Sequence, residues 1–479
     1  MNAILDEDAD GDQQRMRWWA IYALSCGTFL TAIDATVVNV ALPVLGHDLH
    51  MGRYALVWVV NAYLCPFGGF LLISGRLGDL FGRRRVFIAA IALFALASLG
   101  CGISSAAAPL LVMRALQGLS AAAVSTIGMA LTASLFPETG TRARALGFFS
   151  FVGAAGGSTG VLLGGVVTGA LGWHWIFYIN VPFGVVVVYL CMKLIPRDPV
   201  QCGERLNVAG GVVVTTALLL ANFAVTDTSE FGARSLVSGA AAVALLVLFI
   251  LIESRAIFPT VPRDLLALGN FIPGNIVGSL VTVASLSWFF ISTQYLQYVL
   301  HLNPLEAGLS FLPATLFDAV VSIGVVPLLI RKYGIGVPTM IGFTCTFLGL
   351  LLFARAPVSG SVFRDVLPPM MFMGIGIALA YNPIFLASMI WVSNSQAGVA
   401  SGVLNASWAL TGTVGLAFVM KLATDQTQKL EASGVNTAAA LTRGYHWSFT
   451  VSAITVLVAA LVSGLYLRSK PRERSPSLI

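Results

Sequence analysis

Apolar stretches of about 20 residues recur along almost the entire chain, and no other feature limits the fold as strongly. The hydrocarbon core of a bilayer is roughly 30 Å thick, so a helix needs about 20 apolar residues to cross it. Strands of a membrane barrel are about half that length, which excludes them here. The chain is 57% hydrophobic and 10% charged, which is too little polar surface for a water-soluble protein of 479 residues. The sequence therefore predicts an all-α integral membrane protein.

Windows of high hydropathy predict fourteen transmembrane helices. They lie near residues 18–44, 54–74, 86–104, 108–134, 146–170, 173–195, 208–226, 235–252, 271–299, 306–330, 336–356, 366–390, 397–420 and 448–467. Because the number is even, both termini should lie on the same side of the membrane. The longest stretch between spans, 421–446, is polar and Ala-rich, and we expect it to be an outer loop.

The distribution of lysine and arginine tests this count, because basic residues collect in the cytoplasmic loops. One set of alternate loops holds nineteen basic residues, and the opposite set holds seven. The nineteen are Arg15, Arg17, Arg76, Arg83, Arg84, Arg85, Arg142, Arg144, Lys193, Arg197, Arg205, Arg255, Arg263, Arg331, Lys332, Arg468, Lys470, Arg472 and Arg474. This bias supports fourteen spans with both termini in the cytoplasm. It also explains the net charge of +6 without an anionic partner such as nucleic acid.

Two acidic residues, Asp34 and Asp318, lie near the middle of predicted spans. An aspartate at the centre of the bilayer costs roughly 2.5 to 3.5 kcal/mol on insertion scales, so such a residue usually faces a cavity, a partner or an ion path. Both are therefore candidate functional residues. The alternative for Asp34 is a structural hydrogen-bond network in which the carboxyl group stays protonated. The alternative for Asp318 is a pairing with a nearby donor.

The segment after the second span reads Gly75-Arg76-Leu77-Gly78-Asp79-Leu80-Phe81-Gly82-Arg83-Arg84-Arg85. Its glycines allow two helix ends to approach closely, and Asp79 can pair with a nearby arginine or a helix N-terminus. A plain basic loop would explain the arginines but not the spaced glycines and the acid. The segment resembles the loop signature of the major facilitator superfamily. That resemblance assigns Gly75, Gly78, Asp79, Gly82, Arg83 and Arg84 to conformational gating.

Two more segments resemble signatures of this superfamily. Leu110, Arg114, Gln117 and Gly118 are similar to its Arg-containing signature in the fourth span. The fifth span carries Gly156, Gly160 and Gly164 at intervals of four, which offers a small face for tight helix packing. It is similar to the antiporter-associated signature, although Val161 stands where proline is usual. We assign these three glycines to conformational gating as well.

Segments 33–43 and 173–184 resemble signatures of the fourteen-span drug:proton antiporters, and segments 305–313 and 396–405 extend the resemblance into the second half. The resemblance therefore covers nearly the whole chain. It implies a major facilitator fold with a six-helix bundle at 1–206, an inserted two-helix hairpin at 207–262, and a second six-helix bundle with a basic tail at 263–479. The two bundles would rock about a central cavity.

The same resemblance makes Asp34 and Arg114 candidates for proton coupling. Asp318 lies outside any signature of the subfamily and is a candidate because an acid within a membrane span is usually functional. An arginine stays charged, so Arg114 cannot itself carry the proton. It would either tune the protonation of a nearby carboxylate or snorkel to the membrane interface as an anchor. Aromatic and polar side chains are candidates for a cavity that accepts flat apolar or cationic solutes through cation–π contacts. They are Asp34, Asn61, Trp288, Gln294, Asp318, Tyr381, Asn382 and Trp408, with Trp58, Phe289 and Asn405 as further candidates. For any single aromatic, lipid contact or packing is the competing interpretation.

The predicted function is proton-coupled antiport that exports lipophilic, cationic drugs or other small toxic molecules across a bacterial plasma membrane. The predicted partners are thus a small-molecule substrate, protons and the lipid bilayer. A dedicated exporter of one endogenous metabolite, such as an antibiotic, siderophore or lipid, is the alternative. A transporter-like receptor or assembly partner without a transport cycle is an alternative of another class. No nucleophile lies beside a base, the cysteines lack metal-ligand spacing, and no phosphate-binding loop occurs. The sequence therefore predicts no enzyme activity, metal or cofactor.

Overall fold

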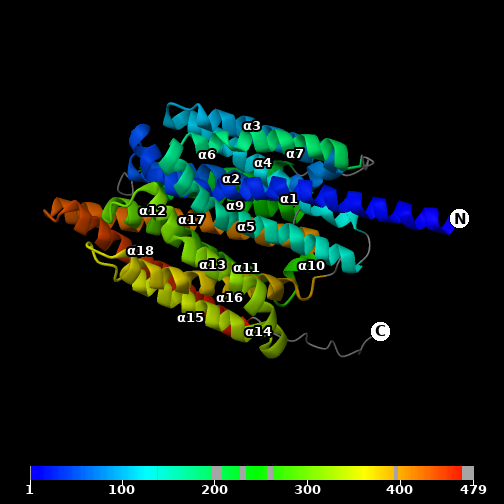
Figure 1. The fold of residues 1–479 in the computed structure, drawn as a ribbon. Coiled ribbons are helices and arrows are strands. Elements are labelled where there is room, and N and C mark those ends of the chain that lie inside the picture. Colours follow the sequence, from blue (N-terminus) through cyan, green and yellow to red (C-terminus); the bar gives the residue numbers. More distant parts are fainter. Residues whose placement is uncertain are drawn as a thin grey trace. The chain divides into compact units, whose positions relative to one another are not determined.

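The computed structural model describes residues 2–136, 139–196, 208–226, 233–255, 263–392 and 397–466, and every regular element within them is a helix (Figure 1). The α-helices of the first half are α1 (Asn2–Asp48), α2 (Arg53–Phe81), α3 (Arg83–Gly102), α4 (Ala107–Leu135), α5 (Thr139–Leu171), α6 (Trp175–Tyr178), α7 (Asn180–Leu194), α8 (Val208–Thr226) and α9 (Ala233–Arg255). Those of the second half are α10 (Arg263–Leu266), α11 (Phe271–Gln294), α12 (Pro304–Ser310), α13 (Leu312–Val320), α14 (Val326–Tyr333), α15 (Gly336–Phe353), α16 (Leu367–Met389), α17 (Ala397–Ala432) and α18 (Thr437–Tyr466). Three π-helical turns, η1 (Tyr295–Val299), η2 (Val321–Val325) and η3 (Val362–Val366), complete the described elements. The prediction of an all-α protein is confirmed for this part of the chain.

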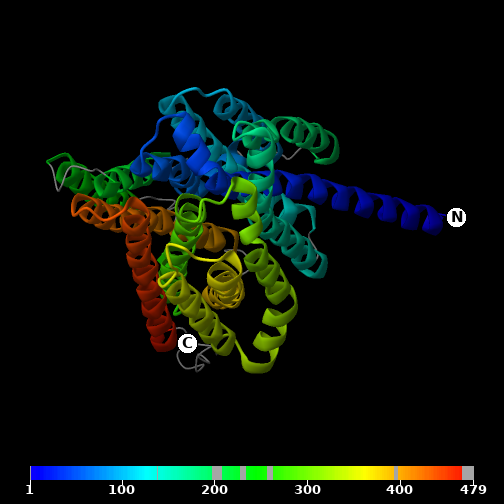
Figure 2. The same ribbon diagram turned by 60° about the vertical axis from the view of Figure 1, so that its left-hand side comes forward.

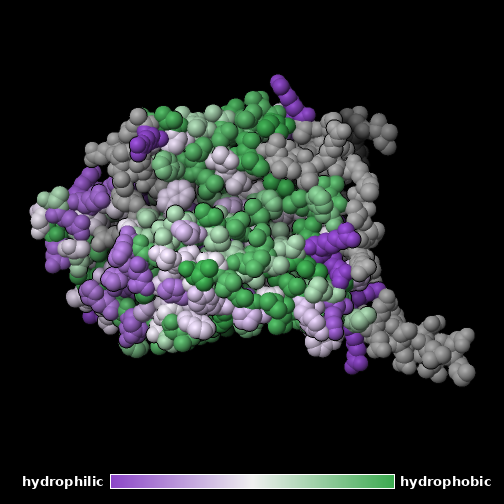
Figure 3. Space-filling model, turned by 90° about the horizontal axis from the view of Figure 1, so that it is seen from above, coloured by the Kyte–Doolittle hydropathy of each residue, from purple (hydrophilic) through white to green (hydrophobic). Residues whose placement is uncertain are grey.

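Eleven helical segments among the described residues are long and apolar enough to cross a membrane. Three shorter apolar helices lie at Ala55–Leu71, Ala155–Leu171 and Val212–Ala221, each at a predicted span. On the face drawn in Figure 3, hydrophobic residues cover the sides of the helices, and hydrophilic residues gather toward the helix ends. Helices with apolar sides and polar ends are the structure that a bilayer selects, because their backbone hydrogen bonds are satisfied internally.

The chain divides into two compact units. Unit 1 comprises Met1–Thr260 and Thr293–Phe311, and unit 2 comprises Val261–Ser292 and Leu312–Ile479. Within unit 1, α1 packs against α5 and α7, α2 packs against α4, and α3 packs against α4 and α7 (Figure 1). Within unit 2, α16 packs against α13 and α15, and α18 packs against α15 and α17 (Figure 2). The polar groups described below therefore lie inside bundles of long apolar helices.

The turn between α2 and α3 consists of one residue. Gly82 is the only residue between Phe81 and Arg83, and its φ of 89° lies in the region that residues with a Cβ rarely adopt. One turn earlier, a Cβ added at Gly78 would lie 3.3 Å from Ile127 on α4. The spaced glycines of this segment thus allow an abrupt reversal and a close approach between helices.

The prediction of an outer loop at 421–446 is wrong, because only residues 433–436 lie between α17 and α18. Alanine favours helix, and an ion pair of 3.6 Å joins Lys421 to Asp425 one turn later. Thr427 Oγ1 also lies 3.4 Å from the Ala440 carbonyl oxygen, which ties the two helices together. His446, which we expected in this loop, lies in α18 with Nε2 2.8 Å from the Ala356 carbonyl oxygen.

The predicted tenth span is a chain of shorter helices, α12, α13, η2 and α14. Pro327, in the first turn of α14, has no N–H to donate to the preceding turn. The π-helical turn η2 (Val321–Val325) comes immediately before α14, where the regular α-helical pattern cannot continue. Asp318 therefore sits in the last turn of α13, beside this irregularity.

Candidate functional site

A cluster of polar side chains is buried inside unit 1. Asp34 on α1 and both Arg114 and Gln117 on α4 have no exposed surface. Ser98 on α3 and Asn180 at the start of α7 are buried in the same place. We call these five residues the Asp34 network. Long apolar helices surround it, so its polar groups must satisfy one another.

The Asp34 carboxylate accepts three hydrogen bonds. Arg114 Nη1 donates to Oδ2 at 2.5 Å and forms an ion pair with it. Gln117 Nε2 and Asn180 Nδ2 donate to Oδ1 at 2.9 Å and 2.8 Å. Charge-assisted hydrogen bonds of this kind are stronger than neutral ones, so the carboxylate joins α1 firmly to α4 and α7.

Ser98 and Gln117 close the network on the side of α3. The Ser98 hydroxyl oxygen accepts hydrogen bonds from Gln117 Nε2 and Asn180 Nδ2, both at 2.9 Å. Gln117 Oε1 accepts from Arg114 Nη1 at 2.9 Å and from Cys101 Sγ at 3.3 Å. The polar groups of α1, α3, α4 and α7 thus depend on one another, and a change at one reaches the others.

Arg114 also contacts α2. Its Nε donates to the Val59 carbonyl oxygen at 3.2 Å, and its guanidinium carbon lies 4.5 Å from the centre of the Tyr63 ring. The Tyr63 hydroxyl in turn donates to the Thr31 carbonyl oxygen at 3.0 Å. Arg114 is therefore paired and buried, and the alternative of an arginine that snorkels to the interface is wrong. Its Nη2 has no hydrogen-bond partner within the described ranges.

Gly118 explains how α2 and α4 approach closely enough for these contacts. A Cβ added at Gly118 would lie 2.8 Å from the carbonyl carbon of Tyr63, which is closer than real Cβ atoms pack. The absence of a side chain therefore lets the two backbones meet one turn beyond Arg114.

The glycine face of α5 packs directly on the backbone of α1. A Cβ added at Gly160 would lie 2.6 Å from the carbonyl oxygen of Ile33, and one at Gly164 would lie 2.5 Å from that of Val37. Gly156 meets α1 one turn earlier. These three glycines therefore touch the turns of α1 immediately around its buried aspartate.

The α5 helix also contacts the short segment of unit 1 that follows α11. A Cβ added at Gly165 would lie 2.9 Å from the Cα atom of Gly308 on α12. Nearby, Gln297 Nε2 donates to the Val40 carbonyl oxygen at 2.7 Å. Both α1 and α5 thus hold the residues Thr293–Phe311 within unit 1.

The loop signature lies at the junction of α2 and α3. Gly78 packs against both α4 and the side chain of Arg83, and the Arg84 guanidinium donates to the Met192 carbonyl oxygen near the end of α7. Gly75 and Asp79 belong to α2, but the surroundings of these two residues lie outside the described part of the structure. Their assignment to gating stays a prediction.

Asp318 has different surroundings, in unit 2. It is half-buried on α13, and the Ser322 hydroxyl donates to its Oδ1 at 3.4 Å. Asn382 Nδ2 on α16 donates to the Ser322 hydroxyl oxygen at 3.1 Å. Among the described residues no basic side chain forms an ion pair with Asp318. This acid is therefore hydrogen-bonded to neutral groups, in contrast to Asp34.

Two of the predicted cavity aromatics meet in unit 2. The rings of Tyr381 and Trp408 are nearly perpendicular, with centroids 4.9 Å apart, and Phe385 lies 6.0 Å from Trp408 on another side. The Trp408 side chain is buried, and its Nε1 has no hydrogen-bond partner in the part of the chain that the structure describes. The indole also packs against Gly278, which leaves room for it.

The remaining cavity candidates belong to both units. Trp288 is buried in unit 2 beside Phe289, with ring centroids 4.4 Å apart. Asn61 on α2 and Gln294 at the end of α11 are buried in unit 1. Asn382 takes part in the contacts of Asp318 through Ser322. The candidates are thus divided between the two units, with Asp34, Asn61 and Gln294 in unit 1 and Trp288, Asp318, Tyr381, Asn382 and Trp408 in unit 2.

Sequence reasoning did not assign a role to Ser98, Cys101 or Ser322. A usable signal existed for Ser98 and Cys101, because Cys101 follows Ser98 by three positions, as Gln117 follows Arg114. Residues at that spacing share a helix face, so each pair predicts a polar face inside an apolar span.

Comparisons with known proteins agree with this architecture. Residues 24–416 match the family model of the Major Facilitator Superfamily. The chain is 33% identical over 464 residues to the puromycin resistance protein of Streptomyces alboniger, with 94% of this chain and 90% of that protein covered. It is 32% identical over 406 residues to a multidrug resistance protein of Mycobacterium tuberculosis, with 84% and 75% covered.

A solved structure supports the fold. An auto-inhibited peptide transporter of the POT family superimposes with a TM-score of 0.67 at 17% sequence identity, over 97% of this chain and 99% of that one. At this identity the likeness concerns the arrangement of helices and not the substrate.

Proposed function

Because the chain belongs to the major facilitator superfamily, and its relatives include proteins named for resistance to an antibiotic and to multiple drugs, we propose that it exports small molecules in exchange for protons. The observation that carries this proposal is the buried ion pair between Asp34 and Arg114. Efflux is supported by the relatives, whose names refer to puromycin resistance and multidrug resistance. Proton coupling is supported by the chemistry of the Asp34 network.

The coupling would work through the charge of Arg114. A proton that binds Asp34 removes the counter-charge of an arginine that remains charged. An unpaired charge inside the protein is costly, so the guanidinium must find a new partner or the surrounding helices must move. Its Nη2, which has no partner within the described ranges, is available for a new contact. Protonation and helix movement are thereby linked.

The helices that would respond are α1, α3, α4 and α7, because the Asp34 network joins them. The glycine face of α5 lies against α1 and offers no side chains to block a shift of that helix. In our proposal, the proton therefore changes how α1 packs, and this change alternates access to the substrate cavity.

Asp318 would carry a second proton. One charge that moves through 100 mV releases about 2.3 kcal/mol, and one pH unit adds about 1.4 kcal/mol. Exchange of one proton for one monovalent cation moves no net charge, so the voltage contributes nothing. Two protons for each cation restore the contribution of the voltage. We therefore propose that Asp34 and Asp318 both titrate during the cycle.

The substrates would be lipophilic and cationic. Tyr381 and Trp408 form an aromatic pair in unit 2, and aromatic faces attract cations as well as flat apolar groups. A dedicated exporter of one antibiotic is the second candidate, which the similarity to a protein named for resistance to puromycin favours. The two candidates differ in breadth of substrate and not in the coupling step.

The proposed architecture has fourteen spans with both termini in the cytoplasm of a bacterial cell. Eleven membrane-length helices and three shorter apolar helices among the described residues support this number. The bias of nineteen against seven basic residues supports the orientation. We propose bundles at 1–206 and 263–479 with an inserted hairpin at 207–262, within which α8 and α9 pack against each other.

Uptake of ethidium into everted membrane vesicles under an imposed pH gradient tests the coupling. We expect the native chain to accumulate ethidium and the Asp34→Asn variant to lose gradient-driven uptake. The Asp425→Asn variant is the matched control, because Asp425 forms a partly exposed ion pair with Lys421 on α17, and pairs near the surface contribute little. A monodisperse, helical Asp34→Asn protein excludes misfolding as the cause.

The possible outcomes separate the hypotheses. Normal uptake by Asp34→Asn would remove Asp34 from the mechanism. Loss of uptake in the Asp425→Asn control as well would show that the assay reports expression and not coupling. If the native chain accumulates no ethidium but exports a single antibiotic, the dedicated exporter replaces the broad one.

A further inference from the structure

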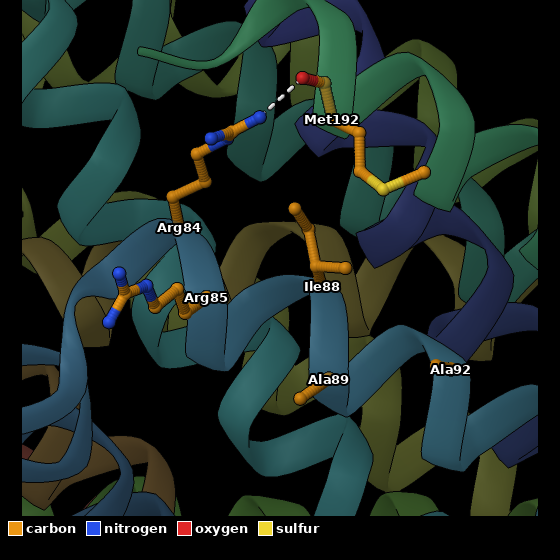
Figure 4. Close-up of a pocket in the computed structure, with 6 residues that line it drawn as sticks. All are labelled: Arg84, Arg85, Ile88, Ala89, Ala92 and Met192. Atoms are coloured by element: carbon orange, nitrogen blue, oxygen red, sulfur yellow. Dashed lines mark hydrogen bonds between the residues drawn. The ribbon is translucent and has the colours of Figure 1, made fainter. Parts of the chain in front are cut away.

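An open groove lies on unit 1 where α3 begins (Figure 4). Its volume is about 530 Å³. One end of its lining is charged and the rest is apolar. The residues are Arg84, Arg85, Ile88, Ala89 and Ala92 of α3 and Met192 of α7. None of them belongs to the Asp34 network.

The groove is amphipathic along the length of α3. Figure 4 shows the two arginines at one end, with Ile88, Ala89 and Ala92 further along the helix. Residues 85, 88, 89 and 92 recur at helical spacing and so lie on one face. The small side chains of Ala89 and Ala92 leave a depression there. From Arg84 to Ala92 the helix rises about 12 Å, close to the roughly 15 Å of one bilayer leaflet.

The arginines lie beside the ends of two helices. Arg84 donates to the Met192 carbonyl oxygen in the last turn of α7, where carbonyl groups lack a partner within the helix. That bond keeps the Arg84 side chain next to the groove. Arg85 is exposed. In the proposed orientation, both guanidinium groups lie at the cytoplasmic surface of the membrane.

We propose that this groove binds one anionic phospholipid of the cytoplasmic leaflet. The lipid phosphate would contact Arg84 and Arg85, since guanidinium groups bind phosphate oxygens with paired hydrogen bonds. One acyl chain would lie along Ala89 and Ala92. A free anion would satisfy the arginines but leave the apolar lining uncovered, whereas a phospholipid covers both. Basic residues beside membrane helices attract anionic headgroups for the same electrostatic reason.

Titration of the purified full-length protein with dioleoylphosphatidylglycerol, followed by native mass spectrometry, tests the site. Arg85→Gln should raise the Kd for the lipid roughly fivefold, because it removes one basic residue near the headgroup. Ala89→Trp fills the depression and should abolish this binding with both arginines intact. Ala89 is exposed, so the larger side chain points away from the core. Ala89→Leu is a milder second variant.

Arg331→Gln is the matched control, because it removes an exposed arginine at the end of α14. Arg331 belongs to unit 2, whereas the groove residues belong to unit 1. Equal weakening by Arg331→Gln would overturn the proposal in favour of general electrostatic attraction. Unchanged binding in both Ala89 variants would overturn the acyl-chain site. Equal affinity for dioleoylphosphatidylcholine would overturn the anionic preference.

Displacement of the lipid by millimolar inorganic phosphate would show that a free anion is the ligand, and the proposal would fail. Ethidium uptake under the pH gradient is measured in parallel with the Ala89→Leu variant. Because Ala89 lies outside both the Asp34 network and the loop signature, its gradient-driven uptake should remain. Failure of the lipid site is therefore distinguishable from failure of the proposed transport function.

Discussion

Asp34 and Arg114 each have no exposed surface, so each supplies the counter-charge that the other needs. Removal of one partner from a buried ion pair costs roughly 3 to 5 kcal/mol, because the remaining charge has no compensation. Gln117 and Asn180 hold the carboxylate from its other oxygen. Whether Asp34 can change its contacts during transport or stays fixed therefore depends on the hydrogen bonds that Arg114, Gln117 and Asn180 donate to it.

Arg114→Lys tests the geometry separately from the charge. A lysine ammonium is a point charge and cannot reach Asp34, Gln117 and the Val59 carbonyl group at the same time. The loss of about two hydrogen bonds at about 1 kcal/mol each predicts roughly a 30-fold fall in gradient-driven ethidium uptake.

Arg331→Lys, at an exposed position, is the control for the same chemical change and should transport normally. If Arg114→Lys instead matches the native chain, positive charge alone is sufficient at this position. The fork of the guanidinium would then have no role in transport.

Among whole helices, α1 is the central element of unit 1. It packs against α4 and α7 through the Asp34 network and against α5 through a face of glycines. The first contact is an ion pair with side-chain hydrogen bonds. The second is a close packing of glycines, with one hydrogen bond of 2.8 Å from Thr36 Oγ1 to the Gly157 carbonyl oxygen. A helix held in this way can shift along its glycine-lined neighbour when its polar contacts change.

Two substitutions on α5 test this packing. Gly160→Ala places a Cβ 2.6 Å from the Ile33 carbonyl oxygen, so α1 and α5 must separate. Gly157→Ala is the matched control, because a Cβ there meets no atom within 4 Å in the described part of the chain. Both changes favour helix by about 1 kcal/mol, so intrinsic propensity cancels between them.

We expect Gly160→Ala to lower the midpoint of thermal unfolding and to reduce ethidium uptake, because it disturbs the packing on both sides of Ile33. Gly157→Ala should leave both quantities close to the native values. Equal behaviour of the two variants would show that contact between α1 and α5 does not limit transport.

In the whole molecule, the two acidic residues that lie near the middle of predicted spans belong to different units. Asp34 in unit 1 is paired with an arginine, whereas Asp318 in unit 2 is bonded to a serine and lies half-buried. Protonation of Asp34 would leave the charge of Arg114 without its counter-charge. Protonation of Asp318 would leave no basic side chain unpaired among the described residues. This difference supports our proposal that the two acids bind protons in two distinct steps of one cycle.

Asp318→Asn should remove the response of transport to voltage. In proteoliposomes with an imposed membrane potential and no pH gradient, the native chain should accumulate ethidium if, as we propose, two protons exchange for one cation. The variant should lose this uptake but keep some uptake under a pH gradient. Unchanged voltage dependence would refute the second proton, and Asp425→Asn again serves as the control.

Much of the fold followed from local patterns in the sequence. Hydropathy over windows of about 20 residues determines whether a segment crosses a bilayer, so the all-helical membrane class was predictable. Signature residues led to the superfamily, and the cost of a charge in the membrane pointed to Asp34. The same local method failed at 421–446, where polar residues look like a loop but continue two helices beyond the apolar spans.

The Asp34 network itself depended on the tertiary structure. Arg114 and Asn180 bond to Asp34 across sequence separations of 80 and 146 residues. The apolar pattern of a span shows that it is buried in a membrane but not which neighbour each of its faces meets. The sequence by itself therefore determined the class of the protein and its charged candidates. Only the packing of α1, α3, α4 and α7 decided which polar groups satisfy one another, because a buried donor bonds to whatever acceptor the fold places beside it.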